Sequence, residues 1–342
     1  MLKNQSNASS SLSAAAKAAP VAEGQSATTE RVKRAVEGRV GIVGLGRMGK
    51  AMATNLAAAG REVVAYVRRS EQLGPLVTLG LSPTTSISDV CACEFVITML
   101  PDDDAVCEVV FGHQDLGADG IAKGMLPGAI HLSMSTISTA TASRLASEHA
   151  RYSQGYVAAP VFGNPDAAKA RQLFIIAAGA PGDIDRCQPI FDALGQQVFR
   201  VGSDPAAANL VKLAGNAMSA ASLEILGEVL ALARKRGLDP QQLLAILTGT
   251  MYGGRLHKVY GEKIATQQYG SGGFLFPLAL KDVRLALNEA ERAGVPMPSV
   301  SVVRDRLISG IARGYSDRDW SALGLLAAEE AGLNPEVTKV SL

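Results

Sequence analysis

The amino-acid sequence predicts an α/β protein with an N-terminal, doubly wound sheet domain and an all-α C-terminal domain, joined by a long interdomain helix. Short β-branched runs alternate with Ala-rich helical stretches from Arg39 to about Gly202. A glycine-rich turn follows the first of these runs, and beyond Gly202 only helical patterns continue. Alternating strands and helices are typical of a parallel sheet with helices on both faces.

Composition marks the elements of the first half. The Ala-rich segments Met48–Ala59 and Thr139–Ala150 predict helices between the strands. The predicted strands are the apolar runs Val40–Val43, Val63–Val67, Phe95–Leu100, Ala129–Leu132 and Leu173–Ala178.

The long helix is predicted over Pro205–Arg236. Three basic residues end it before Gly237, which suits the negative end of a helix dipole and a glycine stop. Asp239 and Pro240 then supply the N-cap and first turn of the next helix. We expect a leader at 1–37, a nucleotide-binding sheet domain at 38–202, the interdomain helix at 203–236, a helical domain at 237–332 and a tail at 333–342.

The composition of the 342-residue chain excludes several classes of protein. With 47% hydrophobic residues, 19% charged residues and a net charge of +1, there is no electrostatic case for nucleic acid or an acidic membrane surface. No apolar run approaches the roughly 20 residues that span a bilayer. The four cysteines show no paired CxxC spacing, which argues against a zinc site or disulfides. We therefore expect no metal and a cytoplasmic protein with free thiols.

Residues 1–37 differ from the rest of the chain. They are rich in Ser and Ala and lack the apolar core of a secretory signal. We interpret them as a disordered leader or an over-long start. An organellar transit peptide is the alternative, although no Arg precedes Arg31.

The first strand runs directly into a GxGxxG turn that opens a helix. The first Gly permits a tight turn, the second lets a pyrophosphate approach the backbone, and the third lets helix and strand pack closely. In this context the motif predicts a Rossmann domain that binds a dinucleotide. The predicted pyrophosphate-binding residues are Gly44, Leu45, Gly46, Arg47, Met48 and Gly49.

The end of the second strand distinguishes between two cofactors. An NAD enzyme would place Asp or Glu roughly 20 residues past the glycines to bind the ribose 2′-hydroxyl, but Val67 occupies this place. Arg68, Arg69 and Ser70 follow, and guanidinium groups with a hydroxyl suit a 2′-phosphate. We expect NADP, with NADPH preferred over NADH. Two arginines that merely cover a strand end are the alternative.

The long helix carries one polar stripe. Lys212 is its only charged residue between Asp204 and Glu224. An ammonium on an apolar helix needs a partner or a lowered pKa, and a carbonyl ligand would supply the partner. Lys212 could then be the general acid for an alkoxide, with a lysine at the helix edge as the alternative. The stripe consists of Asn209, Lys212, Asn216 and Ser219, at helical spacing.

The histidines offer no competing site, because they are scattered along the chain. We expect His131, at the end of a predicted strand, to be a packing residue. The others are His113, His149 and His257.

These motifs resemble those of the β-hydroxyacid dehydrogenase family. That family includes 3-hydroxyisobutyrate dehydrogenases and glyoxylate/succinic semialdehyde reductases, and it is related to imine reductases and 6-phosphogluconate dehydrogenase. The resemblance runs from about residue 39 to residue 332. Lys212 and Asn216 match the family's K-x-x-x-N catalytic helix, in which Asn216 is expected to orient the substrate together with Ser135. The resemblance further implies a cofactor loop at Met99, Leu100 and Pro101, a segment beside nicotinamide and substrate at Ser135 and Thr136, and a C-terminal cofactor contact at Phe274 and Lys281.

One motif departs from the family pattern. The family's substrate loop usually reads Asp-Ala-Pro-Val-Ser-Gly-Gly, whereas residues 158–164 read Ala-Ala-Pro-Val-Phe-Gly-Asn. Phe162 replaces a hydroxyl and Asn164 replaces a glycine, so the loop is expected to form a less polar pocket in which the Gly163 backbone orients the substrate.

The sequence thus predicts an NADPH-dependent reductase of a small aldehyde or a 2- or 3-oxo acid. An imine reductase and a non-catalytic NADPH-binding scaffold are the alternatives. A homodimer is expected from the resemblance and from apolar stretches such as Leu285–Ala293 and Leu323–Ala328.

Overall fold

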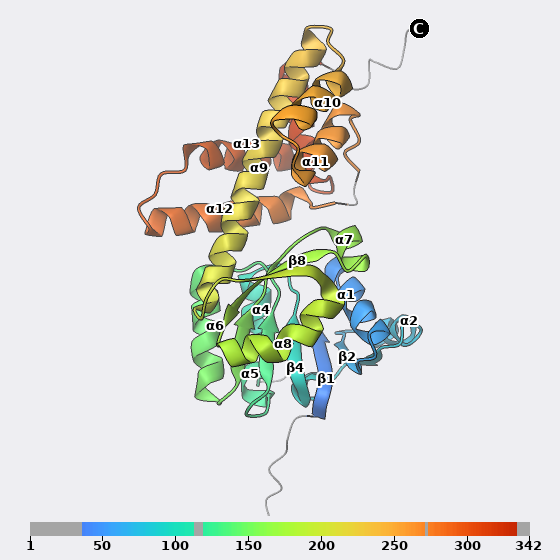
Figure 1. The fold of residues 1–342 in the computed structure, drawn as a ribbon, viewed down its shortest axis with the longest axis vertical. Coiled ribbons are helices and arrows are strands. Elements are labelled where there is room, and N and C mark those ends of the chain that lie inside the picture. The colour runs from blue at the N-terminus through green and yellow to red at the C-terminus, as the bar shows by residue number, and fades with distance from the viewer. Residues whose placement is uncertain (1–35, 113–118, 271–272, 334–342) are drawn as a thin grey trace, which may run out of the picture. The chain divides into compact units, whose positions relative to one another are not determined.

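The computed structural model describes residues 36–112, 119–270 and 273–333. Within these residues the first half forms a sheet of nine strands in the order β3-β2-β1-β4-β5-β6-β8-β7, with β9 paired to β8 (Figure 1). The strands are β1 (Val36–Val43), β2 (Val63–Tyr66), β3 (Ser82–Thr84), β4 (Cys93–Thr98), β5 (Ile130–Ser133), β6 (Gly155–Ala158), β7 (Val161–Phe162), β8 (Leu173–Gly179) and β9 (Gly195–Arg200).

The sheet is parallel from β3 to β6, which confirms the predicted doubly wound arrangement there. Beyond β6 it becomes mixed, because β8 runs antiparallel to both β6 and β7. The chain between β6 and β8 forms β7 and the five-residue helix α7 (Pro165–Lys169). It carries no long crossover helix, and a parallel return needs one.

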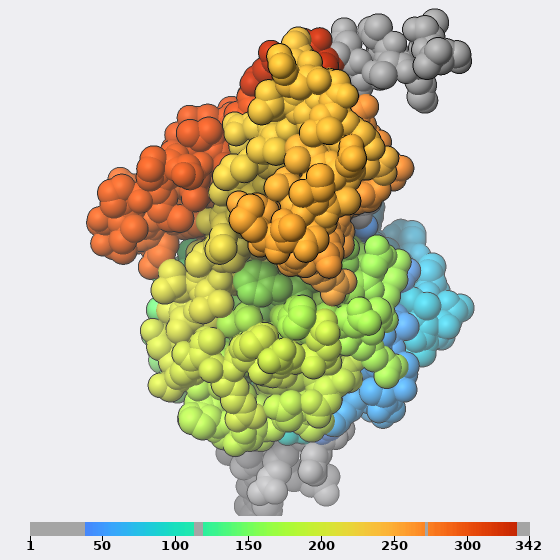
Figure 2. All heavy atoms as spheres, turned by 45° about the horizontal axis from the view of Figure 1, so that its top comes forward, coloured from blue at the N-terminus to red at the C-terminus, as the bar shows by residue number. Residues whose placement is uncertain are grey.

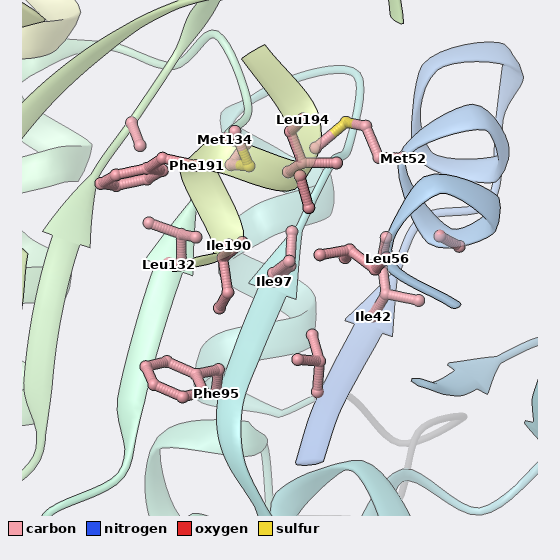
Figure 3. Packing of buried hydrophobic residues seen from close by; sticks show 14 of the residues in the cluster. Ile42, Met52, Leu56, Phe95, Ile97, Leu132, Met134, Ile190, Phe191 and Leu194 are labelled. Atoms are coloured by element: carbon pink, nitrogen blue, oxygen red, sulfur yellow. The ribbon is translucent and has the colours of Figure 1, made fainter. Parts of the chain in front are cut away.

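Helices cover both faces of the sheet. On one face, Met52 and Leu56 of α1 (Arg47–Ala58) pack with Ile42 and Ile97 of the strands, and α8 (Pro181–Leu194) adds Phe191 (Figure 3). The opposite face is covered by α3 (Ile87–Cys91), α4 (Asp103–Phe111), α5 (Ile121–Gly124) and α6 (Thr139–Arg151). Two short elements follow β2, the 3-10 helix η1 (Ser70–Gln72) and α2 (Leu73–Val77).

The second half is helical and is organised on α9 (Pro205–Lys235), which confirms the predicted long helix. Asp204 caps its N-terminus by accepting a hydrogen bond from the backbone N–H of Ala206 at 3.0 Å. Gly237, with φ of 75°, lies just past its end. The remaining helices are α10 (Pro240–Thr250), α11 (Arg255–Ala265), α12 (Phe276–Arg292), α13 (Pro298–Ala312), η3 (Trp320–Ala322) and α14 (Leu323–Glu330).

By length and composition, α9 is the one helix in the described residues that could cross a membrane. This corrects the expectation that no segment is apolar enough. However, 56% of its most apolar stretch is buried inside the fold, where α9 contacts α11, α12, α13 and α14. Packing on several sides therefore accounts for much of its apolar character.

The expectation that Leu323–Ala328 contributes surplus apolar surface is wrong. Leu323, Leu325 and Leu326 of this segment are buried in the same core cluster as Leu223 and Leu230 of α9. The short helix α14 is apolar on several sides because it is enclosed.

Close contact between α9 and α14 depends on glycine. A Cβ atom built on Gly227 would lie 2.7 Å from the Cα atom of Gly324, closer than real Cβ atoms approach backbone.

We therefore expect Gly227→Ala to lower the free energy of unfolding in urea by about 1–3 kcal/mol, since a packed backbone must move. Gly249 of α10 has no heavy atom within 4 Å of such a Cβ. Gly249→Ala is the control, and it should be neutral or stabilising because Ala favours the helix. Equal losses in the two variants would contradict this packing.

Candidate active site

The turn after β1 has the shape that a dinucleotide requires. Gly44 has φ of 100°, and a Cβ atom there would lie 2.3 Å from the carbonyl oxygen of Met99. A Cβ on Gly49 would lie 1.9 Å from the carbonyl oxygen of Gly44, so helix α1 and the turn pack backbone to backbone. Gly46 has no heavy atom within 4 Å of its Cβ position. It is the N-cap of α1 with no side-chain cap, which leaves an open approach to the first-turn N–H groups.

The other predicted cofactor segments lie at the same edge of the sheet. The loops at Met99 and Thr136 follow β4 and β5, which are the next two strands beside β1 and parallel to it. Met99 donates a backbone hydrogen bond to Val43, the last residue of β1, at 2.9 Å. The carboxyl ends of adjacent parallel strands around the order reversal at β1 are where open α/β sheets bind ligands.

The three residues predicted to bind a 2′-phosphate lie at the carboxyl end of β2, next to the glycine turn. Arg68, Arg69 and Ser70 are all exposed, whereas Val67 is buried. Exposed guanidinium groups are accessible to a phosphate, and the buried Val67 has no side-chain group to bond a ribose hydroxyl. The preference for NADP stays a prediction.

Arg47, at the first position of α1, links the glycine turn to the C-terminal half. Its Nη1 donates to the carbonyl oxygen of Gly273 at 3.1 Å. The neighbouring Phe274 packs edge-on against Trp320 with ring centroids 4.9 Å apart, and its backbone N–H donates to Asp319 Oδ2 at 2.9 Å. The segment that carries Phe274 is thus fixed by contacts with both halves of the chain.

Lys212 lies on α9 with its side chain buried. The residue is 8% exposed, and its Nζ donates to Asn216 Oδ1 at 3.1 Å. Nζ also lies 4.6 Å from the centroid of the Phe162 ring, a cation–π contact. Since an ammonium has three donors and one is used here, donors remain for a ligand oxygen.

Asp282 of α12 organises this group. It is 2% exposed, and its Oδ2 accepts a short hydrogen bond from Asn216 Nδ2. Its Oδ1 lies 2.7 Å from Lys281 Nζ, which also donates to the carbonyl oxygen of Thr136 at 2.6 Å. A chain of contacts therefore runs from Lys212 through Asn216 and Asp282 to Lys281 and the β5–α6 loop.

Burial sets the protonation of Lys212. The loss of hydration lowers its pKa to about 8, the Asp282 carboxylate opposes this shift, and the Lys281 ammonium adds to it. At neutral pH the amine is mostly protonated, yet it loses its proton far more readily than a surface lysine. A pKa close to the working pH suits a group that must both give and take a proton.

Phe162 reaches Lys212 because α9 has a glycine opposite the ring. A Cβ atom on Gly215 would lie 2.4 Å from Phe162 Cζ. Phe162 of β7 and Gly215 of α9 therefore fit each other, and the ring lies against the Lys212 ammonium.

The remaining predicted substrate residues have further roles in the fold. Ser135 is fully buried, and its hydroxyl accepts from the N–H of Leu100 at 2.8 Å and donates to the carbonyl oxygen of Thr98 at 3.2 Å. Asn164 caps α7 by accepting from Ala167 N–H at 2.9 Å. Gly163 has φ of 145° and is exposed. Substrate contact by these residues stays a prediction.

None of the described histidines forms a hydrogen bond with Lys212. His131 and His149 are fully buried and are joined at 2.8 Å between Nδ1 and Nε2. Burial lowers the pKa of both, so they are neutral. Thr98 and Gln154 bond the outer nitrogens at 2.9 and 2.6 Å. His131 is thus an interior residue. His113 lies outside the described residues.

Two residues of the site were not predicted from the sequence. Asp282 is recognised only through its partner Asn216, which lies 66 residues away in the chain. Gly215 is one of the unspecified positions of the K-x-x-x-N motif, and only the structure shows that it admits the Phe162 ring. Among the described residues there is no cluster of potential metal ligands, and the four cysteines are free thiols.

Comparison with known proteins agrees with this geometry. Residues 39–202 match the family profile described as the NAD binding domain of 6-phosphogluconate dehydrogenase. Residues 206–327 match the profile described as NAD-binding of NADP-dependent 3-hydroxyisobutyrate dehydrogenase. Both halves of the chain are therefore recognised, in the order that the fold shows.

Individual relatives cover most of the chain. The uncharacterized oxidoreductase YfjR of Bacillus subtilis is 37% identical over 286 residues, which is 83% of this chain and 98% of that protein. The 2-hydroxy-3-oxopropionate reductase of Escherichia coli is 31% identical over 290 residues, covering 83% and 95%.

A solved structure shares the fold. The 3-hydroxyisobutyrate dehydrogenase from Salmonella typhimurium superposes with a TM-score of 0.74 at 23% identity, covering 84% of this chain and 99% of that one. The profiles, the full-length relatives and the glycine turn with its lysine helix all point the same way. The chain belongs to the β-hydroxyacid dehydrogenase family and is an NAD(P)-dependent oxidoreductase.

Proposed function

We propose that this protein reduces a small aldehyde or a 2- or 3-oxo acid with NADPH, and oxidises the corresponding hydroxy acid in reverse. The observation that carries the proposal is the buried Lys212, which has one hydrogen-bond partner within the described residues and a pKa lowered to about 8. A structural lysine gains nothing from such burial, because the Asn216 amide, the Phe162 ring and the Asp282 carboxylate compensate the lost hydration only in part, as the lowered pKa shows.

The roles of the residues follow from their positions. When bound, the reduced nicotinamide supplies a hydride to the carbonyl carbon. Lys212 donates a proton from Nζ to the oxygen that becomes the hydroxyl, and the neutral amine takes that proton back in the reverse reaction. Asn216 holds Nζ in place, and Asp282 holds the Asn216 amide.

The substrate class rests on two further observations. A relative at 31% identity carries the name 2-hydroxy-3-oxopropionate reductase, a small oxo acid reductase. Phe162 faces the ammonium at 4.6 Å, so the pocket has an apolar wall beside the proton donor. We propose that this wall favours substrates less polar than glyoxylate, because a ring gives no hydrogen bond to a carboxylate.

We further propose a homodimer that forms along α9. Five large apolar residues of this helix are exposed, and four of them, all except Leu210, follow a strict seven-residue spacing; atoms of α9, in yellow, reach the surface (Figure 2). A seven-residue repeat is the pattern by which two helices pack along a shared seam. A second copy of this chain presents the same seam. The residues, with their exposed fractions, are Val211 (38%), Met218 (75%), Ile225 (58%) and Leu232 (62%).

The lysine has a direct test. Lys212→Ala should lower kcat for carbonyl reduction by about 10²–10⁴-fold, because the proton donor is lost. NADPH affinity should stay within about threefold, since the phosphate contacts lie on other segments. Lys212→Arg should restore little, because guanidinium hardly releases its proton. Lys258→Ala, at an exposed lysine on α11, is the control. If Lys212→Ala reduces carbonyls at nearly the wild-type rate, the lysine is structural, and imine reduction becomes the leading function.

Arg68 should determine the choice of cofactor. One charge-assisted contact to a phosphate is worth about 1.5–3 kcal/mol, so Arg68→Ala should lower kcat/KM for NADPH by roughly tenfold or more. The value for NADH should hardly change, because NADH has no 2′-phosphate. Steady-state kinetics with both cofactors measure this. A wild type that uses NADH as well as NADPH would show the assignment to be wrong.

The proposed dimer is tested by light scattering at micromolar concentration. The wild type should be dimeric, and the double variant Met218→Asp, Ile225→Asp should be monomeric, since buried unpaired carboxylates oppose association. Val302→Asp is the matched control, because Val302 is 55% exposed on α13, outside the seam. A monomeric wild type, or a double variant that stays dimeric, would contradict the proposal.

A further inference from the structure

Asn209 is a buried amide without a partner. The residue is 1% exposed, and within the described residues neither its Oδ1 nor its Nδ2 has a hydrogen-bond partner. Leaving a buried donor or acceptor unpaired costs about 1–3 kcal/mol. In contrast, Asn216 on the same helix has both its amide nitrogen and its oxygen paired. A ligand that pairs with Asn209 would remove this cost.

The side chain lies on the face of α9 that carries Lys212 and Asn216. In a helix of 3.6 residues per turn, positions seven apart point in directions about 20° apart, so Asn209 and Asn216 share one face. Lys212 lies between them along the helix axis. Since Asn216 and Lys212 are in the site, Asn209 extends the same polar row by one turn toward the N-terminus of α9.

The residues around Asn209 indicate which ligand it would meet. The adjacent Ala208 is buried in the core cluster that contains Val43, the residue before the glycine turn, and Leu100, in the loop after β4, packs against the same cluster. Leu213, one turn further on, belongs instead to the cluster of the helical half. Asn209 therefore lies on the cofactor side of Lys212, and Asn216 lies on the side of α12.

We propose that Asn209 binds the carboxamide of the nicotinamide ring. Its Nδ2 donates to the carboxamide oxygen, and its Oδ1 accepts from the carboxamide N–H. A primary carboxamide presents a donor and an acceptor side by side, as does the unpaired asparagine, so the two groups satisfy each other completely. The pair fixes the rotation of the ring next to Lys212. The inference rests on the proposed function in that it places the nicotinamide beside this lysine.

The test compares two cofactors without any carbonyl substrate. In the 3-acetylpyridine analogue of NADPH a methyl group replaces the carboxamide nitrogen, so the analogue can still accept a hydrogen bond but cannot donate one. Fluorescence titration should show that the wild type binds NADPH about 3- to 10-fold more tightly than the analogue. Asn209→Leu should bind both with the same weakened affinity. The melting temperature of the cofactor-free variant should be equal to or above that of the wild type, because an unpaired amide has been removed.

A second variant and a control keep the result interpretable. Asn209→Ser removes the amide and adds no volume that the surrounding core must accept. This variant should lose the discrimination between the cofactors in the same way. Ser222→Ala, at a partly exposed position of α9, should keep the discrimination. If Asn209→Leu and Asn209→Ser still discriminate between the cofactors as the wild type does, the proposal is wrong. It is also wrong if only the KM of the carbonyl substrate rises, since the amide would then face the substrate.

The binding assay separates this inference from the proposed function. Failure to reduce any aldehyde or oxo acid would overturn the substrate class and leave the discrimination between cofactors unaffected. Loss of discrimination in Asn209 variants that remain folded would confirm the contact whichever carbonyl is the substrate.

Discussion

The structure depends on keeping one ammonium group out of water. Lys212 is enclosed by α9, α12 and the Phe162 ring, and burial lowers its pKa to about 8. An isolated buried cation is costly unless nearby groups compensate. Here the compensation is shared between the Asn216 amide, the aromatic face and the Asp282 carboxylate. These partners come from segments far apart in the chain, so the protonation of one residue reports on the assembly of the whole site.

The long helix makes this assembly feasible. At its N-terminal end, Ala208 packs into the core of the sheet domain, and from Leu213 onward its apolar residues pack into the core of the helical domain. Lys212 lies at the change from one core to the other. A helix is the rigid element on which residues three, four and seven apart can line one face. The polar row places the lysine beside the Phe162 ring of β7. Asn216, Asp282 and Lys281 then connect it to the backbone of Thr136, in the loop that follows β5.

Much of this could be predicted from the sequence, because the signals are local. The GxGxxG turn, the alternation of strands and helices, and the single lysine on an apolar helix all lie within short windows. The pairing of Asn216 with Asp282 could not be predicted, since it joins positions that only tertiary packing brings together. Strand β9 was missed because Gln196 and Gln197 are exposed and give no apolar run.

Apolar composition misled in a different way. Leu323–Ala328 suggested surface for a partner, but its side chains fill the protomer's own core, whereas α9 carries a row of exposed apolar residues at seven-residue spacing. Composition counts apolar residues and does not say which face they occupy. For Ser135, the sequence motif identified a residue of the site region, and the structure showed that its hydroxyl bonds the backbone of the neighbouring loop.

The most direct test of the central claim is the pH dependence of kcat/KM for hydroxy acid oxidation, measured for the wild type and for Asp282→Asn. Oxidation needs the neutral amine, so the rate should rise with pH through an apparent pKa of about 8 in the wild type. The Asp282 carboxylate raises the pKa of Lys212, so its removal should move the midpoint to lower pH. A midpoint near the roughly 10.4 of a solvated lysine, or the same midpoint in both proteins, would contradict the account of a buried lysine held by Asn216 and Asp282.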